Sequence, residues 1–269
     1  MAADLENSST GLALVLAPYD PSGSAHLPAD ALTGARLGCH VLSVPTALLV
    51  RDTAQLESIQ PLAEDTADDQ ARCLLEDVNI QAIKCGPVYS PEMASMVAGL
   101  CADYPELPLV LHLSAMPAGL DDIDAEDALD ACLRLLLPLS ALLVVDHASL
   151  EQWQADGMLE DGESAIAGLL GAGGHAVLCT GAPGAAGQWH FLFHGHHGQL
   201  SYTLPRDSNL RQQDLDSLLA AACACRLAQG MELDSALESA LNHLQDRLQD
   251  TFQPGMGHRL FNHATNRHD

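Results

Sequence analysis

A short loop near the start of the chain carries the first residues that could bind a ligand. Residues 20–24 read D-P-S-G-S, follow an apolar run at 11–18 and precede a helical pattern. Loops that join a strand to a helix lie at the carboxyl edge of an open α/β sheet, where ligands bind. Asp20, Ser22 and Gly23 could contact a ligand there. The same residue types also form ordinary β-to-α turns, so the loop by itself leaves both interpretations open.

Lys84 is the single lysine of the chain, beside ten arginines, and it lies in the short apolar run 82–85. A lone lysine within a buried strand can serve a function. The alternative is that an acidic, salt-adapted surface has shed its lysines and this one survives without a role. The residue type alone does not separate these two hypotheses.

Histidines are densest at His190, His194, His196 and His197. Neutral imidazoles are good metal ligands, but no cysteine or carboxylate accompanies these at the spacing of a metal site. We therefore interpret the cluster as the polar tip of a hairpin and expect no metal site. The sequence also lacks the motifs of phosphate loops, dinucleotide folds, nucleophile elbows and zinc peptidases.

The composition is that of an acidic folded protein. Among 269 residues, 36 aspartates and glutamates outnumber 11 lysines and arginines, giving a formal charge of −25 with 48% hydrophobic residues. This hydrophobic fraction is too high for a disordered chain, and the negative charge disfavours nucleic acid and membranes as partners. We find no signal-peptide pattern and no run of 18 apolar residues. Eight scattered cysteines without a C-x-x-C pair suit a reducing compartment, so we expect a cytoplasmic protein.

Short apolar runs alternate with helical patterns along most of the chain. Strands are predicted at 11–18, 41–46, 82–85, 107–113, 141–145 and 175–180. Helices are predicted at 30–37, 65–78, 91–104, 125–137 and 162–170. Such alternation predicts an α/β fold, a three-layer α/β/α sandwich with a mostly parallel central sheet.

The last third of the chain adds a hairpin and two helices. Runs at 189–193 and 199–204 predict an antiparallel hairpin. Leucines at three- and four-residue spacing predict one helix that ends at Gly230 and another that starts at a capping box from Ser235 to Glu238. The predicted organisation is an N-terminal tail, a single domain and a loose C-terminal tail: 1–10, 11–250 and 251–269.

Several segments follow one another in the order of a known family. Residues 18–30 correspond to G-x-D-P-S-G-G-A-G-x-Q-A-D, residues 46–53 to T-A-L-T-x-Q-[ND]-T, and residues 83–88 to V-K-x-G-M-L. Residues 135–139 correspond to L-L-P-L, and residues 179–181 to a glycine strand that borders a nucleotide site. In these segments the chain resembles the hydroxymethylpyrimidine/phosphomethylpyrimidine kinases of thiamine biosynthesis. The resemblance implies a ribokinase-like fold.

The resemblance also implies roles for individual residues. It implies substrate contacts for Asp20, Ser22, Gly23, Arg51, Gly86, Pro87 and His112. It implies nucleotide contacts for Asp146, Thr180 and Gly181. Lys84 falls on the family lysine, which favours a function for it.

The signature loop of the family departs most from its pattern. In the family, G-[ST]-G-C-T forms a glycine loop at a helix N-terminus that cradles the transferred phosphoryl group, with the cysteine at the position of the catalytic base. Counting back from Gly230 places Asp214, Asp216 and Ser217 on the two glycines and the cysteine. Carboxylates there would repel phosphate, by about 4 kcal/mol per like-charge contact at about 4 Å and an effective dielectric of about 20. Either aspartate could also be an ordinary helix N-cap.

Four further segments depart from the family pattern. The family's D-P-V is H-L-S from His112, and its N-x-x-E, associated with magnesium-bound phosphates, is D-H-A-S from Asp146. The glutamine that contacts the pyrimidine is Arg51, and the methionine of G-M-L is Pro87. A fixed positive charge at Arg51 favours a different, anionic ligand.

We therefore expect a divergent family member that is a pseudokinase, whose scaffold binds a pyrimidine or another small molecule without transferring phosphate. The alternative is an active kinase that uses ATP and Mg²⁺ to phosphorylate hydroxymethylpyrimidine or its phosphate. In that case Ser217 or Asp216 would replace the missing cysteine as the base. The resemblance also implies a homodimer.

Overall fold

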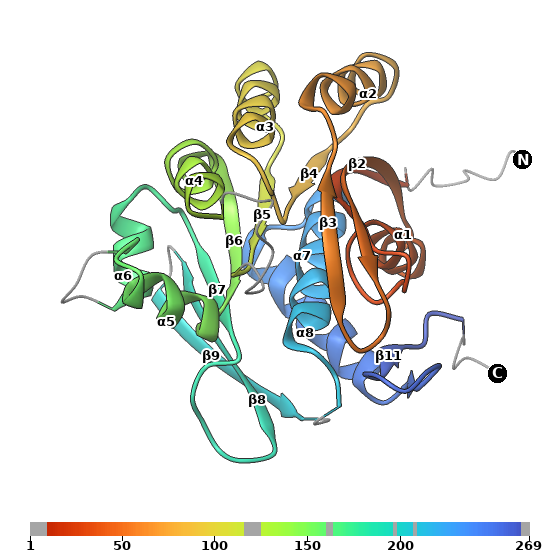
Figure 1. Cartoon of the computed structure of the whole chain (residues 1–269), viewed down its shortest axis with the longest axis vertical. Helices are drawn as coiled ribbons and strands as arrows, with labels where there is room; N and C mark the ends of the chain where they lie inside the picture. Colours follow the sequence, from red (N-terminus) through yellow and green to blue (C-terminus); the bar gives the residue numbers. More distant parts are fainter. Residues whose placement is uncertain (1–9, 116–124, 160–163, 196–197, 207–208, 265–269) are drawn as a thin grey trace, which may run out of the picture.

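The computed structural model describes residues 10–115, 125–159, 164–195, 198–206 and 209–264. At its centre lies a nine-stranded sheet (Figure 1), with the strand order β3-β2-β1-β4-β5-β6-β7-β8-β9. The neighbours from β2 to β7 pair in parallel, whereas β3, β8 and β9 pair antiparallel to their neighbours. The prediction of a mostly parallel central sheet is confirmed.

The interior strands are continuous apolar runs because helices bury both of their faces. The strands of the sheet are β1 (Gly11–Tyr19), β2 (Cys39–Arg51), β3 (Leu56–Pro61), β4 (Ala82–Cys85), β5 (Leu109–Leu113), β6 (Ser140–Asp146), β7 (Val177–Thr180), β8 (Gln188–Gly195) and β9 (Gly198–Pro205). The run predicted at 82–85 agrees with β4 to the residue. The antiparallel β3 is absent from the prediction because its sequence, L-E-S-I-Q-P, is mostly polar.

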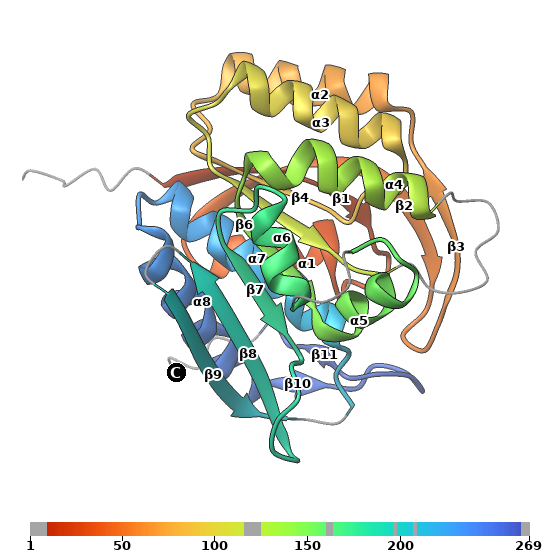
Figure 2. The same ribbon diagram turned by 90° about the vertical axis from the view of Figure 1, so that its left-hand side faces the viewer.

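Helices cover both faces of the sheet (Figures 1 and 2). The helices are α1 (His26–Arg36), α2 (Glu64–Asp77), α3 (Pro91–Asp103), α4 (Ala125–Ala131), α5 (His147–Ala155), α6 (Ala165–Gly171), α7 (Gln212–Ala228) and α8 (Leu233–Leu248). Residues from α2 to α6 form one apolar core with the sheet, and α7 and α8 form a second core on the opposite face, where α1 packs against α7. The predicted three-layer α/β/α sandwich is therefore confirmed.

Helix α7 is the central element of its layer. Of its 17 residues, 13 are buried, and most of these are alanine, leucine or cysteine, whose small or apolar side chains allow close packing on the strands. It ends before Gly230, which takes a positive φ of 81° as a helix-terminating glycine does. The buried polar residues Asp214, Asp216 and Ser217 all lie in its first two turns, at the carboxyl edge of the parallel strands.

Three helix predictions need correction. Helix α5 is not predicted from the sequence, and the helix predicted at 125–137 is α4 followed by a π-helical turn (Cys132–Leu136) and a 3-10 turn (Leu137–Leu139). Pro138 in that turn has no N–H to donate, which ends the regular helix. Helix α8 begins at Leu233 with Glu232 at its N-cap, so the capping box predicted at Ser235 is wrong.

The C-terminal segment is also better ordered than the prediction of a loose tail. It forms a small antiparallel pair, β10 (Thr251–Phe252) and β11 (Leu260–Phe261). Phe261 is only 4% exposed and packs in the core that α7 and α8 form. The prediction fails because this segment has neither helical nor strand periodicity, so its burial depends on a surface that other elements create.

No helix within the described ranges is both long enough and apolar enough to cross a membrane.

We predict that Phe261→Ala lowers the free energy of unfolding by about 3–5 kcal/mol, because it empties a buried aromatic site. Phe252→Ala is the matched control, since Phe252 lies in the same pair of strands but is 44% exposed. The control should lose less than about 1 kcal/mol. Urea unfolding followed by circular dichroism measures both. A loss from Phe261→Ala as small as that of the control would show that Phe261 is not part of the folded core.

Candidate functional site

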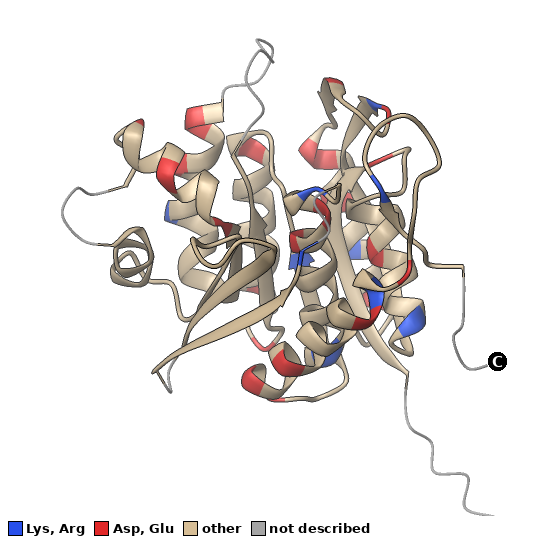
Figure 3. Ribbon diagram, turned by 90° about the horizontal axis from the view of Figure 1, so that it is seen from below, with Lys and Arg blue, Asp and Glu red and all other residues tan. Residues whose placement is uncertain are grey.

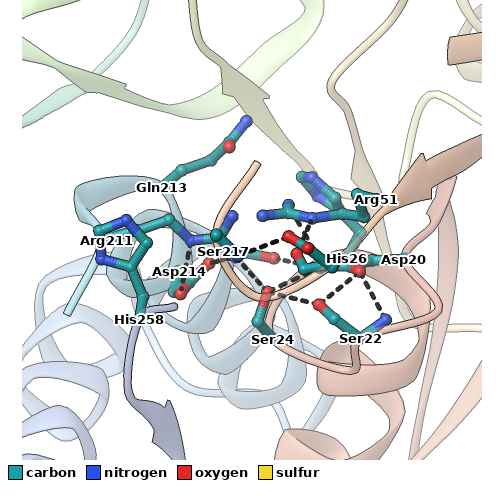
Figure 4. Close-up of polar contacts among 12 residues, drawn as sticks. Asp20, Ser22, Ser24, His26, Arg51, Arg211, Gln213, Asp214, Ser217 and His258 are labelled. Atoms are coloured by element: carbon teal, nitrogen blue, oxygen red, sulfur yellow. Dashed lines mark hydrogen bonds and ion pairs between the residues drawn. The ribbon is translucent and has the colours of Figure 1, made fainter. Parts of the chain in front are cut away.

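The loop after β1 forms the centre of the candidate site (Figure 4). The Asp20 carboxylate is buried and accepts hydrogen bonds from the Ser22 amide at 2.8 Å, the Ser22 hydroxyl at 2.7 Å and the Ser24 hydroxyl at 2.8 Å. Gly23 takes a positive φ of 70°, a conformation that glycine adopts at little cost. The structure thus brings Asp20, Ser22 and Gly23 together at the carboxyl edge of β1. Their role as substrate contacts stays a prediction.

Arg51, at the end of β2, lies beside this loop. Its guanidinium approaches the Asp20 carboxylate to 3.5 Å, and the two side chains are 2% and 0% exposed. Two charges that leave water this completely require good partners, and here the serine donors complete the shell around the carboxylate. The sequence singles out both residues, but their pairing follows from the parallel alignment of β1 with β2.

The N-terminus of α7 faces the same loop and is closed by an ion pair. The guanidinium of Arg211 donates to both carboxylate oxygens of Asp214, at 3.2 and 2.9 Å, and also to the Ser24 hydroxyl. Asp214 is 1% exposed, and burial raises its pKa to about 6 although Arg211 opposes the shift. Arg211 was not singled out by the sequence, because a lone arginine before a helix carries no motif.

The position of α7 changes the interpretation of the signature loop. The sequence comparison places that loop on residues 214–218, but α7 already begins at Gln212, with Arg211 at its N-cap. The residues that actually surround the helix N-terminus are therefore 211–214. Asp214 lies in the first turn, whereas Asp216 and Ser217 lie further inside the helix and point to different partners.

Asp216 faces the strand that was predicted to border a nucleotide. Its Oδ1 accepts hydrogen bonds from the Thr180 hydroxyl at 2.6 Å and from the Gln212 amide at 2.9 Å, while Oδ2 has no partner within the described ranges. Burial, followed by the negative charge of Asp146, raises its pKa to about 8. The side chain therefore holds a proton at neutral pH. Gly181 lies next to Gln212, where a Cβ atom would come within 2.8 Å of the amide oxygen.

Asp146 is the N-cap of α5. It accepts a hydrogen bond from the Ser149 amide at 2.9 Å and another from the Ser149 hydroxyl, which itself accepts from the Ala115 amide at 2.7 Å. Ser149 stands where the family has a glutamate. Asp146 thus lies near Thr180 and Asp216, but its carboxylate caps the N-terminus of α5.

A second polar cluster lies directly beneath the loop. The Lys84 ammonium lies 2.5 Å from the Asp30 carboxylate, and both side chains are 0% exposed. The Ser217 hydroxyl donates to the other oxygen of Asp30 at 3.1 Å and accepts from the His26 amide at 2.8 Å. Lys84 therefore has a defined structural partner. Asp30 could have been found from the sequence, because it is the last residue of the segment that resembles the first family motif.

Two buried histidines complete this cluster. The rings of His26 and His112 are 6.2 Å apart, and neither has a hydrogen-bond partner within the described part of the chain. Burial and the nearby Lys84 ammonium lower the pKa of both imidazoles well below its usual value, so both are neutral. His26 has a positive φ of 58° at a position where the family has glycine, a signal that the sequence contained.

Gly86 and Pro87 lie beside this cluster, immediately after β4, and both are buried. The φ of Gly86 is 111°, and a Cβ atom there would lie 2.1 Å from the carbonyl oxygen of His112. A glycine is thus required because the two backbones approach so closely.

A metal site is not found within the described ranges, since no three histidine, cysteine or acidic side chains gather in a metal-binding arrangement. His190 and His194 are half-buried residues of β8. His196 and His197 lie outside the described residues.

The fold agrees with solved structures of small-molecule kinases. It superposes on pyridoxal kinase of Bacillus subtilis, solved as an ADP complex, with a TM-score of 0.83 and 17% identity over 95% of this chain and 98% of that one. Pyridoxal kinase of Staphylococcus aureus, in complex with AMP-PCP and pyridoxal, gives a TM-score of 0.80 and 17% identity over 95% and 94%. Phosphomethylpyrimidine kinase of Clostridium difficile gives 0.70 and 22% over 87% and 99%. The chain therefore has a ribokinase-like fold, which it shares with these kinases.

Sequence similarity narrows this class to one family. The sequence model of the phosphomethylpyrimidine kinase family matches residues 20–262. The hydroxymethylpyrimidine/phosphomethylpyrimidine kinase of Streptomyces coelicolor is 28% identical over 91% of both chains. The enzyme of the same name from Escherichia coli is 28% identical over 91% of this chain and 94% of its own. The chain belongs to the phosphomethylpyrimidine kinase family.

We predict that Lys84→Met lowers the free energy of unfolding by about 3–5 kcal/mol, because it leaves the Asp30 carboxylate buried without a counter-ion. The double variant Lys84→Met/Asp30→Asn should regain part of that loss. The control is Arg134→Met, which breaks an exposed pair with Asp130 and should cost about 1 kcal/mol or less. Urea unfolding measures all three. If Lys84→Met lowers the free energy of unfolding no more than Arg134→Met does, the buried pair does not constrain the fold.

We predict that Asp216→Asn stabilises the protein at alkaline pH. The folded-state pKa of Asp216 lies above its ordinary value. The stability that Asp216 contributes is therefore complete below about pH 4 and is lost as the pH rises through 8. Asparagine resembles the protonated acid and does not ionise. The variant should therefore exceed the parent by at least about 2 kcal/mol in free energy of unfolding at pH 9, with the difference shrinking toward pH 4.

Urea unfolding between pH 4 and pH 9 tests this pH dependence, with the exposed Asp246→Asn as the control. A constant difference between Asp216→Asn and the parent across this range would refute it.

Proposed function

We propose that this chain is a pseudokinase of its family, which binds a small molecule and has lost phosphoryl transfer. The observation that carries the proposal is the ion pair of Arg211 with Asp214 at the N-terminus of α7. A helix N-terminus attracts anions through its free N–H groups and its dipole. Here a bulky guanidinium and a carboxylate occupy the space beside those groups, where the family has a glycine loop.

The neighbouring residues at this helix end are also bulky and engaged. The Gln212 amide donates to Asp216, and the Gln213 amide donates to the Ser114 hydroxyl at 3.3 Å. Phosphoryl transfer depends almost entirely on positioning and electrostatic stabilisation of the phosphoryl group. A phosphate would have to displace Arg211 from its partners before it could reach the backbone amides.

The residues predicted to contact the nucleotide also offer few ligands for magnesium-bound phosphates. The carboxylate of Asp146 caps α5, and Ser149 supplies a hydroxyl in place of the family glutamate. Mg²⁺ prefers carboxylate ligands together with phosphate oxygens. These residues do not fit ATP with Mg²⁺ well, so we assign no catalytic step to the nucleotide.

The ligand of this scaffold is proposed to be a small molecule with a negative group. Arg51 occupies the position where the family places a neutral amide against the pyrimidine. Its guanidinium lies 3.5 Å from the Asp20 carboxylate, which is longer than a tight ion pair, so it can also donate hydrogen bonds to an anionic ligand. The same family membership supports the further proposals of a homodimer and a cytoplasmic location.

A second candidate function is active phosphoryl transfer with Asp214 as the base. When the family signature is aligned with residues 211–215, which surround the start of α7, its cysteine falls on Asp214. A buried carboxyl group with a pKa of about 6 can accept a proton at neutral pH. This candidate requires Arg211 to leave Asp214 when the substrate binds.

We predict that the protein transfers no phosphoryl group from ATP, in the presence of Mg²⁺, to hydroxymethylpyrimidine or to hydroxymethylpyrimidine phosphate. The E. coli relative serves as the positive control under identical conditions, and mass spectrometry of the pyrimidine measures the product. Turnover of about 1–100 s⁻¹, the usual kinase range, would overturn the pseudokinase proposal. Loss of such turnover in Asp214→Asn, with retention in Asp246→Asn, would establish the second candidate. Thermal shifts with anionic pyrimidines separately test for ligand binding.

A further inference from the structure

The cationic side chains of this acidic protein are unevenly distributed. In Figure 3, the Lys and Arg segments lie mostly in the half of the molecule that carries the C-terminus. Three arginines lie in the last turns of three helices: Arg36 in α1, Arg226 in α7 and Arg247 in α8. Their charges act on the pKa values of two nearby imidazoles, His243 and His263, and Arg247 also acts on Arg36. We call these five residues the C-terminal cation cluster.

Two guanidiniums of this cluster share one acceptor. Arg36 Nη2 and Arg247 Nη1 each donate to the carbonyl oxygen of Asn262 at 3.3 Å, which holds two positive charges close together. Asp250 lies 3.7 Å from Arg247 and supplies a carboxylate. Arg226 instead uses neutral partners, donating to the Ser239 hydroxyl, the Leu37 carbonyl and the Gln229 amide oxygen. The Asp250 carboxylate also acts on Arg36, so it offsets part of the positive charge of the three guanidiniums.

The positive charge of the cluster also affects the pKa of its two imidazoles. Burial lowers the pKa of His243 to about 4, and the guanidiniums of Arg247, Arg226 and Arg36 contribute to the shift. Burial, Arg36 and Arg247 lower the pKa of His263 to about 4 in the same way.

Several nitrogen atoms of the cluster lack a hydrogen-bond partner. His243 Nε2, His263 Nδ1 and Arg247 Nε have no hydrogen-bond partner in the described part of the chain, and the Arg247 side chain is only 8% exposed. Buried polar groups without partners are uncommon in folded proteins, and a bound ion is one way in which they are satisfied.

We propose that the C-terminal cation cluster binds a phosphate-sized oxyanion, at a site separate from the loop after β1 and independent of the proposed function. Such an anion accepts several charge-assisted hydrogen bonds, which guanidinium groups donate particularly well. It would neutralise the mutual repulsion of the arginines. It would also connect the ends of α1 and α8, which carry Arg36 and Arg247, to the C-terminal segment.

The test is isothermal titration calorimetry of the full chain with inorganic phosphate at constant ionic strength. We expect saturable binding that Arg36→Gln weakens by about tenfold, the effect of losing one charge-assisted contact. Arg134→Gln is the matched control, since it removes the same charge from an exposed position on another face. Absence of saturable binding, or equal weakening in the control, would overturn the proposal.

Two further measurements locate the site. Sulfate, whose charge is constant over this range, should bind more tightly at pH 5.5 than at pH 7.5, because a bound anion favours protonation of His243 and His263. The variant His263→Gln should reduce that difference while it leaves the fold intact by circular dichroism. Amide NMR shifts caused by phosphate should appear near residues 36 and 262. Shifts confined to residues 20–24 and 211–214 would refute the assignment to the cluster.

Discussion

The buried ion pair between Lys84 and Asp30 is the constraint on which the ligand edge of this protein depends. Lys84 comes from the interior strand β4 and Asp30 from α1, and both side chains are 0% exposed. Because an unpaired charge in that position would be strongly unfavourable, the two elements must keep their relative placement. Ser217 extends the constraint to α7 by donating to Asp30 and accepting from the His26 amide. The loop after β1 and the start of α7 are thereby held against each other.

Above this pair, the charges of the candidate site are already compensated within the protein. Asp20 is paired with Arg51, and Asp214 with Arg211. Asp216 is protonated at neutral pH because burial raises its pKa to about 8. The N-terminus of α7 is thereby lined by the side chains of Arg211 and Asp214. The proposal that phosphoryl transfer is lost treats the family scaffold and its chemistry as separable, since function depends on the site rather than on the fold.

The few lysines and arginines of this chain are concentrated at two places in the structure. The chain has 11 lysines and arginines against 36 acidic residues. Arg51, Lys84 and Arg211 all serve the candidate site, and three further arginines meet beside the C-terminal segment. Most of the acidic residues that the structure describes are instead exposed to solvent, where water and salt screen their repulsion. The excess of acid among these residues is therefore mainly a property of the surface.

The sequence by itself determined the fold class, the run of β4 and the segments that form the ligand edge, because alternating apolar runs and small-residue loops are local signals. It also singled out Asp20, Arg51, Lys84 and Asp146 before their partners were known. Only the tertiary structure decided which charges pair, because those partners are far apart in the chain: Lys84 lies 54 residues from Asp30, and Ser217 lies 187 from it. It likewise decided that α7 begins at Gln212, and hence that Arg211 rather than Asp214 lies at its N-cap. A helix boundary and a buried ion pair both depend on contacts across the sheet, which no local pattern of residues contains.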